Sequence, residues 1–77
     1  MEFSKTLSVL KELYMKDNIE VVTHEGKRIR GLVRSMKTVQ AFTAPSVEME
    51  RADGELIRIS FSDITEIIDY NATETRP

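Results

Sequence analysis

Residues 26 to 37, Gly26-Lys-Arg-Ile-Arg-Gly-Leu-Val-Arg-Ser-Met-Lys37, decide the fold predicted for this chain. Ile29 and Val33 alternate with arginines, which is the period of a strand that buries one face. Gly31 stands in the middle, where a glycine marks a sharp bend or a close backbone approach. The stretch also holds five basic residues and no acid, in a chain of net charge -2. It therefore carries both a fold hypothesis and a functional one.

Length and composition limit the classes of protein to consider. Seventy-seven residues make one domain, which buries about 60% of the surface of its unfolded chain. The absence of cysteine excludes disulfides and thiolate metal sites. The longest apolar runs are two or three residues, and the N-terminus lacks a signal-peptide pattern. We expect a soluble, cytoplasmic protein with no membrane partner, folded over residues 1–70, with a flexible polar tail over 71–77.

The N-terminal segment from Phe3 to Lys16 has the period of an amphipathic helix. Its apolar residues recur at steps of three and four: Phe3, Leu7, Leu10, Leu13 and Tyr14. Ser4 or Thr6 is suited to cap its start, and Asp17-Asn18 to end it. A short helix is marginal alone, so this one is expected to dock its apolar stripe on the rest of the chain.

Two strands are predicted next, over residues 19–24 and 28–36, around the turn Glu25-Gly26-Lys27. A three-residue turn places two sets of residues on opposite faces. The core face holds Ile19, Val21, Thr23, Ile29, Gly31 and Val33, and the solvent face holds Glu20, His24, Arg28, Arg30 and Arg34.

Further strands are predicted over residues 38–44, with Val39 and Phe42 as anchors, and over 47–51, 56–61 and 64–69. The turn Ala-Asp53-Gly54-Glu makes the clearest hairpin. A two-residue turn there would pair Arg51 with Leu56, whereas burial of one apolar face needs a loop with an odd number of residues or a bulge. We favour the apolar face because it decides the core, and it sets Glu50 opposite Arg58. That face holds Val47, Met49, Ile57, Ile59 and Phe61.

The order of elements is mainly β: an N-terminal helix, then a strongly bent five-stranded antiparallel sheet. This layout is similar to an Sm-like barrel, one of the SH3-like small barrels. The sequence from Asn18 to Gly26, followed by Ile29-Arg-Gly-Leu-Val33, resembles half of the first Sm motif. The resemblance spans roughly residues 3 to 69. It implies an SH3-like (Sm-like) barrel, ring assembly by edge strands, and RNA binding.

The pocket residues of that family do not match this chain. The family binds RNA bases with an Asp, an Asn and an Arg-Gly pair, whereas this chain has Lys37-Thr-Val-Gln40 and Ser62-Asp-Ile64 at the matching places. A second resemblance is to YolD-like small bacterial proteins, which close with a pattern similar to Ile59-Ser-Phe-Ser-Asp-Ile-Thr-Glu-Ile67. It implies a regulatory or accessory role without chemistry.

The basic strand face is the candidate binding site, and it comprises Lys27, Arg28, Arg30, Arg34 and Lys37. Arginines at such spacing can neutralise phosphates, and the two lysines extend the track. The alternative is a solvated strand whose arginines are partly neutralised by Glu20 and Glu25. Aromatic residues for stacking are scarce here, with Phe42 the nearest, so backbone contacts and strong salt dependence are expected.

The histidine and the acidic residues do not indicate a metal-binding or catalytic site. His24 is the only histidine and adjoins a turn, so it is expected to be exposed rather than to bind a metal. The acidic residues Asp63, Glu66 and Asp69, and Glu48 with Glu50, suit a soluble surface better than acid–base work. No phosphate-binding loop, nucleophile elbow or metal-ligand spacing is present. We expect no enzyme and no cofactor. Four further side chains are expected to fill gaps around the helix rather than to contact a partner: Phe3, Tyr14, Met36 and Met49.

Two functions remain open. The first is a non-catalytic small barrel that binds RNA or another nucleic acid through the basic face, as a ring-like homo-oligomer joined by edge strands. The second is a protein-interaction or accessory module that uses an edge strand or the helix face, with the arginines only solvating it.

Overall fold

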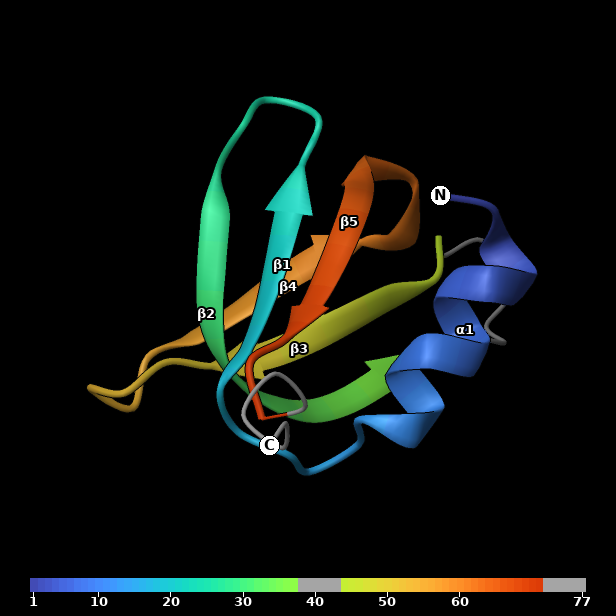
Figure 1. The fold of residues 1–77 in the computed structure, drawn as a ribbon. Helices are drawn as coiled ribbons and strands as arrows, with labels where there is room; N and C mark the ends of the chain where they lie inside the picture. Colours follow the sequence, from blue (N-terminus) through green and yellow to red (C-terminus); the bar gives the residue numbers. More distant parts are fainter. Residues whose placement is uncertain (38–43, 72–77) are drawn as a thin grey trace, which may run out of the picture.

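The computed structural model describes residues 1–37 and 44–71, and it contains one helix and five strands (Figure 1). In chain order these elements are α1 (Phe3–Glu12), β1 (Ile19–Thr23), β2 (Arg28–Lys37), β3 (Ser46–Glu50), β4 (Leu56–Ser60), a 3₁₀ turn (Phe61–Asp63) and β5 (Ile64–Asp69). The strands form one antiparallel sheet in the order β4-β3-β2-β1-β5. The predicted class, a helix followed by a five-stranded antiparallel sheet, is confirmed.

The sheet is open in the described part of the chain, with β4 and β5 as its two edges. The backbone pairing among the described residues therefore does not close the sheet into a barrel. Six runs of the sequence have strand character, and five of them are the strands described here. The remaining predicted strand, 38–44, lies outside the described residues except for Ala44, which is not in a strand.

Strand β2 belongs to both halves of the sheet, because it changes partner at Gly31. Its first half pairs with β1, with Gly31 opposite Ile19, and from Leu32 onward it pairs with β3. A Cβ atom on Gly31 would overlap the carbonyl oxygen of Glu50 and would lie 2.9 Å from the Glu50 carbonyl carbon. The predicted close approach at Gly31 is confirmed, and the neighbour is the end of β3.

A β-bulge at Arg34 adds a second irregularity to β2. Val33 pairs with Met49, but the next pair is Ser35 with Glu48, so Arg34 is the extra residue. Because a bulge shifts the alternation by one, Met36 instead of Ser35 shares a face with Val47. This explains why Met36 packs against the core.

The first hairpin has the predicted faces with a shifted turn. Thr23 donates its N–H to the Lys27 carbonyl at 3.0 Å, so the turn spans residues 24–26 instead of 25–27, and β1 ends at Thr23. Gly26 has φ +86 and donates to the Thr23 carbonyl. Ile19, Val21 and Val33 are fully buried.

The second hairpin has a loop with an odd number of residues, as burial of the apolar face required. Arg51 donates its N–H to the Glu55 carbonyl at 2.8 Å across a three-residue loop, and Met49 pairs with Ile57. The pairing of Glu50 with Arg58 is wrong: Arg58 faces Glu48, and Glu50 faces Leu56. Phe61 is buried as predicted, but in the 3₁₀ turn.

Helix α1 is shorter than predicted, since it ends at Glu12 rather than Lys16. Met15, in the left-handed region, donates its N–H to the Val33 carbonyl at 2.7 Å, and Val33 donates back to Lys16 at 3.1 Å. Pairing with β2 thus replaces the last helical turn. At the start, Glu2 is the capping position and has no side-chain cap, whereas Thr6 donates its hydroxyl to the Glu2 carbonyl.

The core lies between the inner face of the sheet and α1. Leu10 and Leu13 of the helix segment join the buried strand residues, with Phe61 and Ile64 from the end of the chain. Asn71, the first residue of the predicted tail, donates its side-chain amide to the Asp17 carbonyl at 2.8 Å, and the rest of that tail, residues 72–77, lies outside the described residues. No helix within residues 1–37 and 44–71 is long and apolar enough to cross a membrane.

The close approach at Gly31 makes a stability prediction. We expect Gly31→Ala to lower the free energy of unfolding by about 3 kcal/mol, because the new methyl group meets backbone that cannot rotate away. Denaturant titration followed by circular dichroism measures this change.

Gly26 and Gly54 provide matched controls, since a Cβ on either would touch nothing within 4 Å although both have positive φ. Alanine at either position should cost about 1 kcal/mol through backbone strain alone. If Gly31→Ala costs no more than these two variants, the close approach does not constrain the fold.

Candidate nucleic-acid interface

The five predicted site residues are all exposed and follow β2 from its turn to its end. Lys27 precedes the strand, Arg28 and Arg30 lie before the bend at Gly31, Arg34 is the bulge residue, and Lys37 ends the strand. A straight strand of this length would span about 30 Å. Because β2 bends, the residues divide into two groups on the two halves of the sheet.

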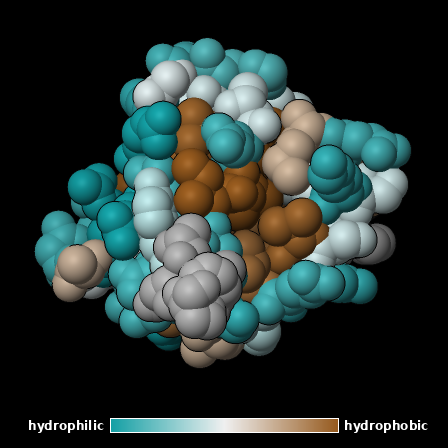
Figure 2. All heavy atoms as spheres, viewed as in Figure 1, coloured by the Kyte–Doolittle hydropathy of each residue, from teal (hydrophilic) through white to brown (hydrophobic). Residues whose placement is uncertain are grey.

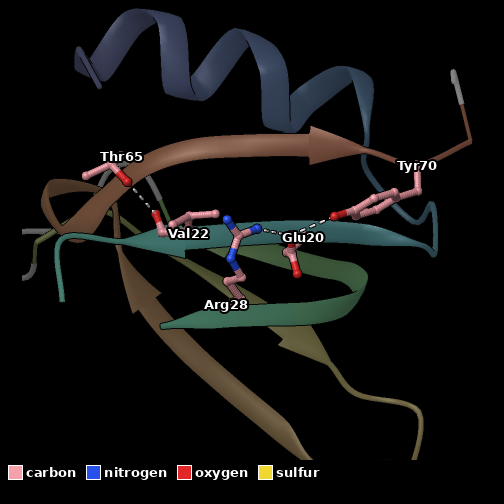
Figure 3. Close-up of polar contacts among 5 residues, drawn as sticks. All are labelled: Glu20, Val22, Arg28, Thr65 and Tyr70. Atoms are coloured by element: carbon pink, nitrogen blue, oxygen red, sulfur yellow. Dashed lines mark hydrogen bonds and ion pairs between the residues drawn. The ribbon is translucent and has the colours of Figure 1, made fainter. Parts of the chain in front are cut away.

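Arg28 belongs to a network on the outer face of β1, β2 and β5 (Figure 3). Its Nη1 lies 2.9 Å from Oε1 of Glu20, and the same oxygen accepts a hydrogen bond from the Tyr70 hydroxyl at 2.9 Å. Glu20 was predicted to be solvated but is only 8% exposed. A buried carboxylate needs such partners, which is why Arg28 and Tyr70 close over it.

Tyr70 is the residue that sequence reasoning missed. The Arg30 guanidinium lies over its ring, with Cζ 4.1 Å from the ring centroid, in a cation–π contact. Tyr70 reaches this place because β5 pairs with β1 and the Tyr70 N–H donates to the Asn18 carbonyl at 3.1 Å. The available signal was an aromatic residue directly after the last predicted strand. An aromatic ring is thus set among the basic residues, from the far end of the chain.

Around the second half of β2, each of the two arginines lies close to a glutamate carboxylate. Arg34 Nη1 lies 2.8 Å from Oε1 of Glu50, and Arg58 lies 3.7 Å from Glu48. Ser35 also donates to Glu48, at 3.2 Å. These charges neutralise one another at the surface, and exposed pairs of this kind contribute little to stability.

Two carboxylates therefore cancel two of the five positive charges. Within the described ranges, the side chains of Lys27 and Lys37 make no ion pair. The positive charge that is available to a ligand is concentrated at Lys27, Arg30 and Lys37. A guanidinium has five N–H donors, so Arg28 and Arg34 can still donate while they are paired.

Other candidate residues have structural positions. His24 is exposed, as predicted, and its backbone N–H donates to the Asp63 carbonyl at 2.9 Å. Met49 is fully buried, and Phe3 lies 5.6 Å from Phe61 between ring centroids while remaining 46% exposed. Tyr14, predicted to fill a gap, is 52% exposed. No group of three or more potential metal ligands occurs in residues 1–37 and 44–71.

The network makes a prediction for Tyr70. Its hydrogen bond to Glu20, with burial and the Glu20 charge, raises the pKa of the Tyr70 phenol above 10.0. In a Tyr14→Phe background, which leaves one tyrosine, ultraviolet titration should give this raised pKa. Glu20→Gln should lower it toward 10.0, because the phenolate no longer faces a carboxylate.

The same shift fixes the direction of a pH effect on stability. The folded protein holds the Tyr70 proton more tightly than the unfolded chain does. The stabilisation is complete below the unfolded pKa near 10 and is lost as the pH rises through the folded pKa. Tyr70→Phe should abolish this alkaline loss. An unchanged Tyr70 pKa in Glu20→Gln would contradict the network.

Comparison with known proteins gives no relative that bears on this site. No protein-family model, no curated protein and no solved structure matches the chain.

Proposed function

We propose that this protein is a non-catalytic RNA-binding module that uses the outer face of β2. The observation that carries the proposal is the Arg30 guanidinium over the Tyr70 ring. Lys27, just before β2, and Lys37, at its end, make no ion pair within the described part of the chain. RNA-binding surfaces combine cations for phosphates with flat groups on which unstacked bases lie. This combination supports RNA binding in preference to a strand whose arginines are only solvated.

Phosphate contacts supply most of the affinity in the proposed mechanism. Lys27, Arg30 and Lys37 neutralise backbone phosphates and release counterions, while Arg28 and Arg34 donate through N–H groups not used by their carboxylates. Such contacts position the strand without reading its sequence. The affinity then falls steeply as the salt concentration rises.

The proposal includes the SH3-like (Sm-like) barrel and a ring-like homo-oligomer. Two features support it: a strand shared between two halves of the sheet and bent at a glycine, and an order that leaves β4 and β5 as edges. An edge strand carries unpaired backbone groups. Pairing of β4 of one copy with β5 of the next is head-to-tail, and such contacts generate a ring when the rotation closes.

Charge reversal tests the binding face. The triple variant K27E/R30E/K37E should weaken binding of a fluorescent single-stranded RNA by at least about tenfold at moderate salt, because three phosphate contacts become repulsive. The slope of log affinity against log salt should fall by about 2, since each single-strand contact contributes about 0.7. Fluorescence anisotropy over a salt series measures both quantities.

The matched control reverses three lysines of the N-terminal segment, K5E/K11E/K16E. These lysines are exposed, and the net charge changes by the same amount. The control should retain most of the RNA affinity. Equal losses in both triple variants would show that overall charge, and not the β2 face, attracts RNA, and the proposal would be wrong.

A specific feature also favours the second candidate, a protein-interaction module. In the view of Figure 2 an apolar area, bordered by hydrophilic residues, lies over β1 and β5 and extends toward α1. Phe3 and Met15 add exposed apolar surface on the helix segment. If light scattering across a salt series finds a monomer without RNA binding, this second function replaces the first.

A further inference from the structure

A cavity of about 470 Å³ lies at the bend of β2, between the residues before β1 and the end of β3. It is lined by Asp17, Asn18, Arg30 and Leu32, and by Arg51 and Ala52 from the second hairpin. Its volume is in the range of small-molecule sites. Among the predicted basic residues only Arg30 lines this cavity, so the bend cavity adjoins the phosphate track and shares Arg30 with it.

The bend cavity combines two guanidinium groups with apolar surface. The Tyr70 ring packs against one side of the Arg30 guanidinium. This contact lowers the conformational entropy that the Arg30 side chain loses when a ligand binds. Arg51 is half exposed, and its Nη1 lies 4.0 Å from Oε1 of Glu55. The Glu50 carboxylate in the lining is already paired with Arg34. The Asp17 carboxylate also lines the cavity, so the two guanidinium groups share the lining with two carboxylates, and Arg30 and Arg51 are its donors for an anionic group.

Asn18 gives the cavity a polar edge held in a fixed place. Its backbone is in the left-handed region at φ 58, and its carbonyl accepts the Tyr70 N–H. Its side-chain amide donates to Asn71 Oδ1 at 3.4 Å, while the amide oxygen makes no hydrogen bond among the described residues. An amide with a free acceptor can read the edge of a base.

We propose that the bend cavity holds one nucleotide of a bound RNA strand. Arg30 and Arg51 bind its phosphate, Leu32 and Ala52 contact the flat face of its base, and Asn18 hydrogen-bonds to the base edge. This site rests on the proposed function and deepens it, because it adds a base-reading position to a track that binds phosphates alone. It also explains how a chain without the Sm pocket residues can still contact a base.

Two cavity variants with controls test the nucleotide site. Ala52 is an exposed turn residue, so Ala52→Trp fills the cavity without disturbing the core, and Arg51→Gln removes one donor. The control Arg58→Gln changes an arginine of nearly equal exposure, 49% against 50%, outside the cavity. Anisotropy with a labelled single-stranded RNA should show about a tenfold loss in the two cavity variants and little change in the control.

Amide chemical shifts identify the ligand class. Titration with the four nucleoside 5′-monophosphates should shift the Asn18 side-chain amide and the Leu32 and Ala52 backbone amides, and Asn18→Gly, which keeps the left-handed backbone, should weaken the response. Inorganic phosphate should bind more weakly than any nucleotide that binds. Equal binding of inorganic phosphate would overturn the proposal.

The outcomes separate the two proposals. If RNA binding is lost in K27E/R30E/K37E but is unchanged in Ala52→Trp and Arg51→Gln, the nucleotide site is wrong and the RNA-binding face stands. If mononucleotides shift the cavity amides and Ala52→Trp abolishes these shifts, while RNA does not bind, the nucleotide chemistry stands and the RNA-binding proposal fails.

Discussion

The contact between Gly31 and the carbonyl group of Glu50 is the constraint on which the rest of the structure depends. It lets β2 pass close to the end of β3, so a single strand serves β1 on one half of the sheet and β3 on the other. In a chain of 77 residues, this curvature wraps a few strands around one core and leaves α1 to cover it. The same bend creates the cavity beside Arg30 and divides the basic residues into two groups.

Charge pairing then decides which basic residues are available to a ligand. The most buried carboxylate of the outer face, Glu20, is satisfied by Arg28 and Tyr70, and the bulge places Arg34 beside Glu50. These contacts reduce the net positive charge of the surface, and they also hold side chains in fixed positions. They fix Tyr70 under Arg30, so an aromatic ring and a cation share one position. The functional proposal follows from this arrangement more than from the number of arginines.

The strand period predicted much of the fold, because burial of one face is a local property of the sequence. Ile19, Val21 and Val33 are buried as expected, and the odd loop after Arg51 follows from the same reasoning. The errors arise where distant contacts override local pattern. Backbone pairing of residues 15–16 with Val33 shortens α1. Tyr70 could not be placed beside Arg30 without the pairing of β5 with β1, which joins segments about fifty residues apart.

The most direct test of the account is a map of where RNA touches the protein. Amide chemical-shift changes on adding a short single-stranded RNA should concentrate in residues 26–37, in Asn18, in Tyr70, and in the turn around Ala52. The outer face of α1, including Lys5 and Lys11, should show little change. Changes concentrated on α1 and the β5 edge, with β2 unaffected, would contradict the account and place the interaction on the apolar side of the molecule.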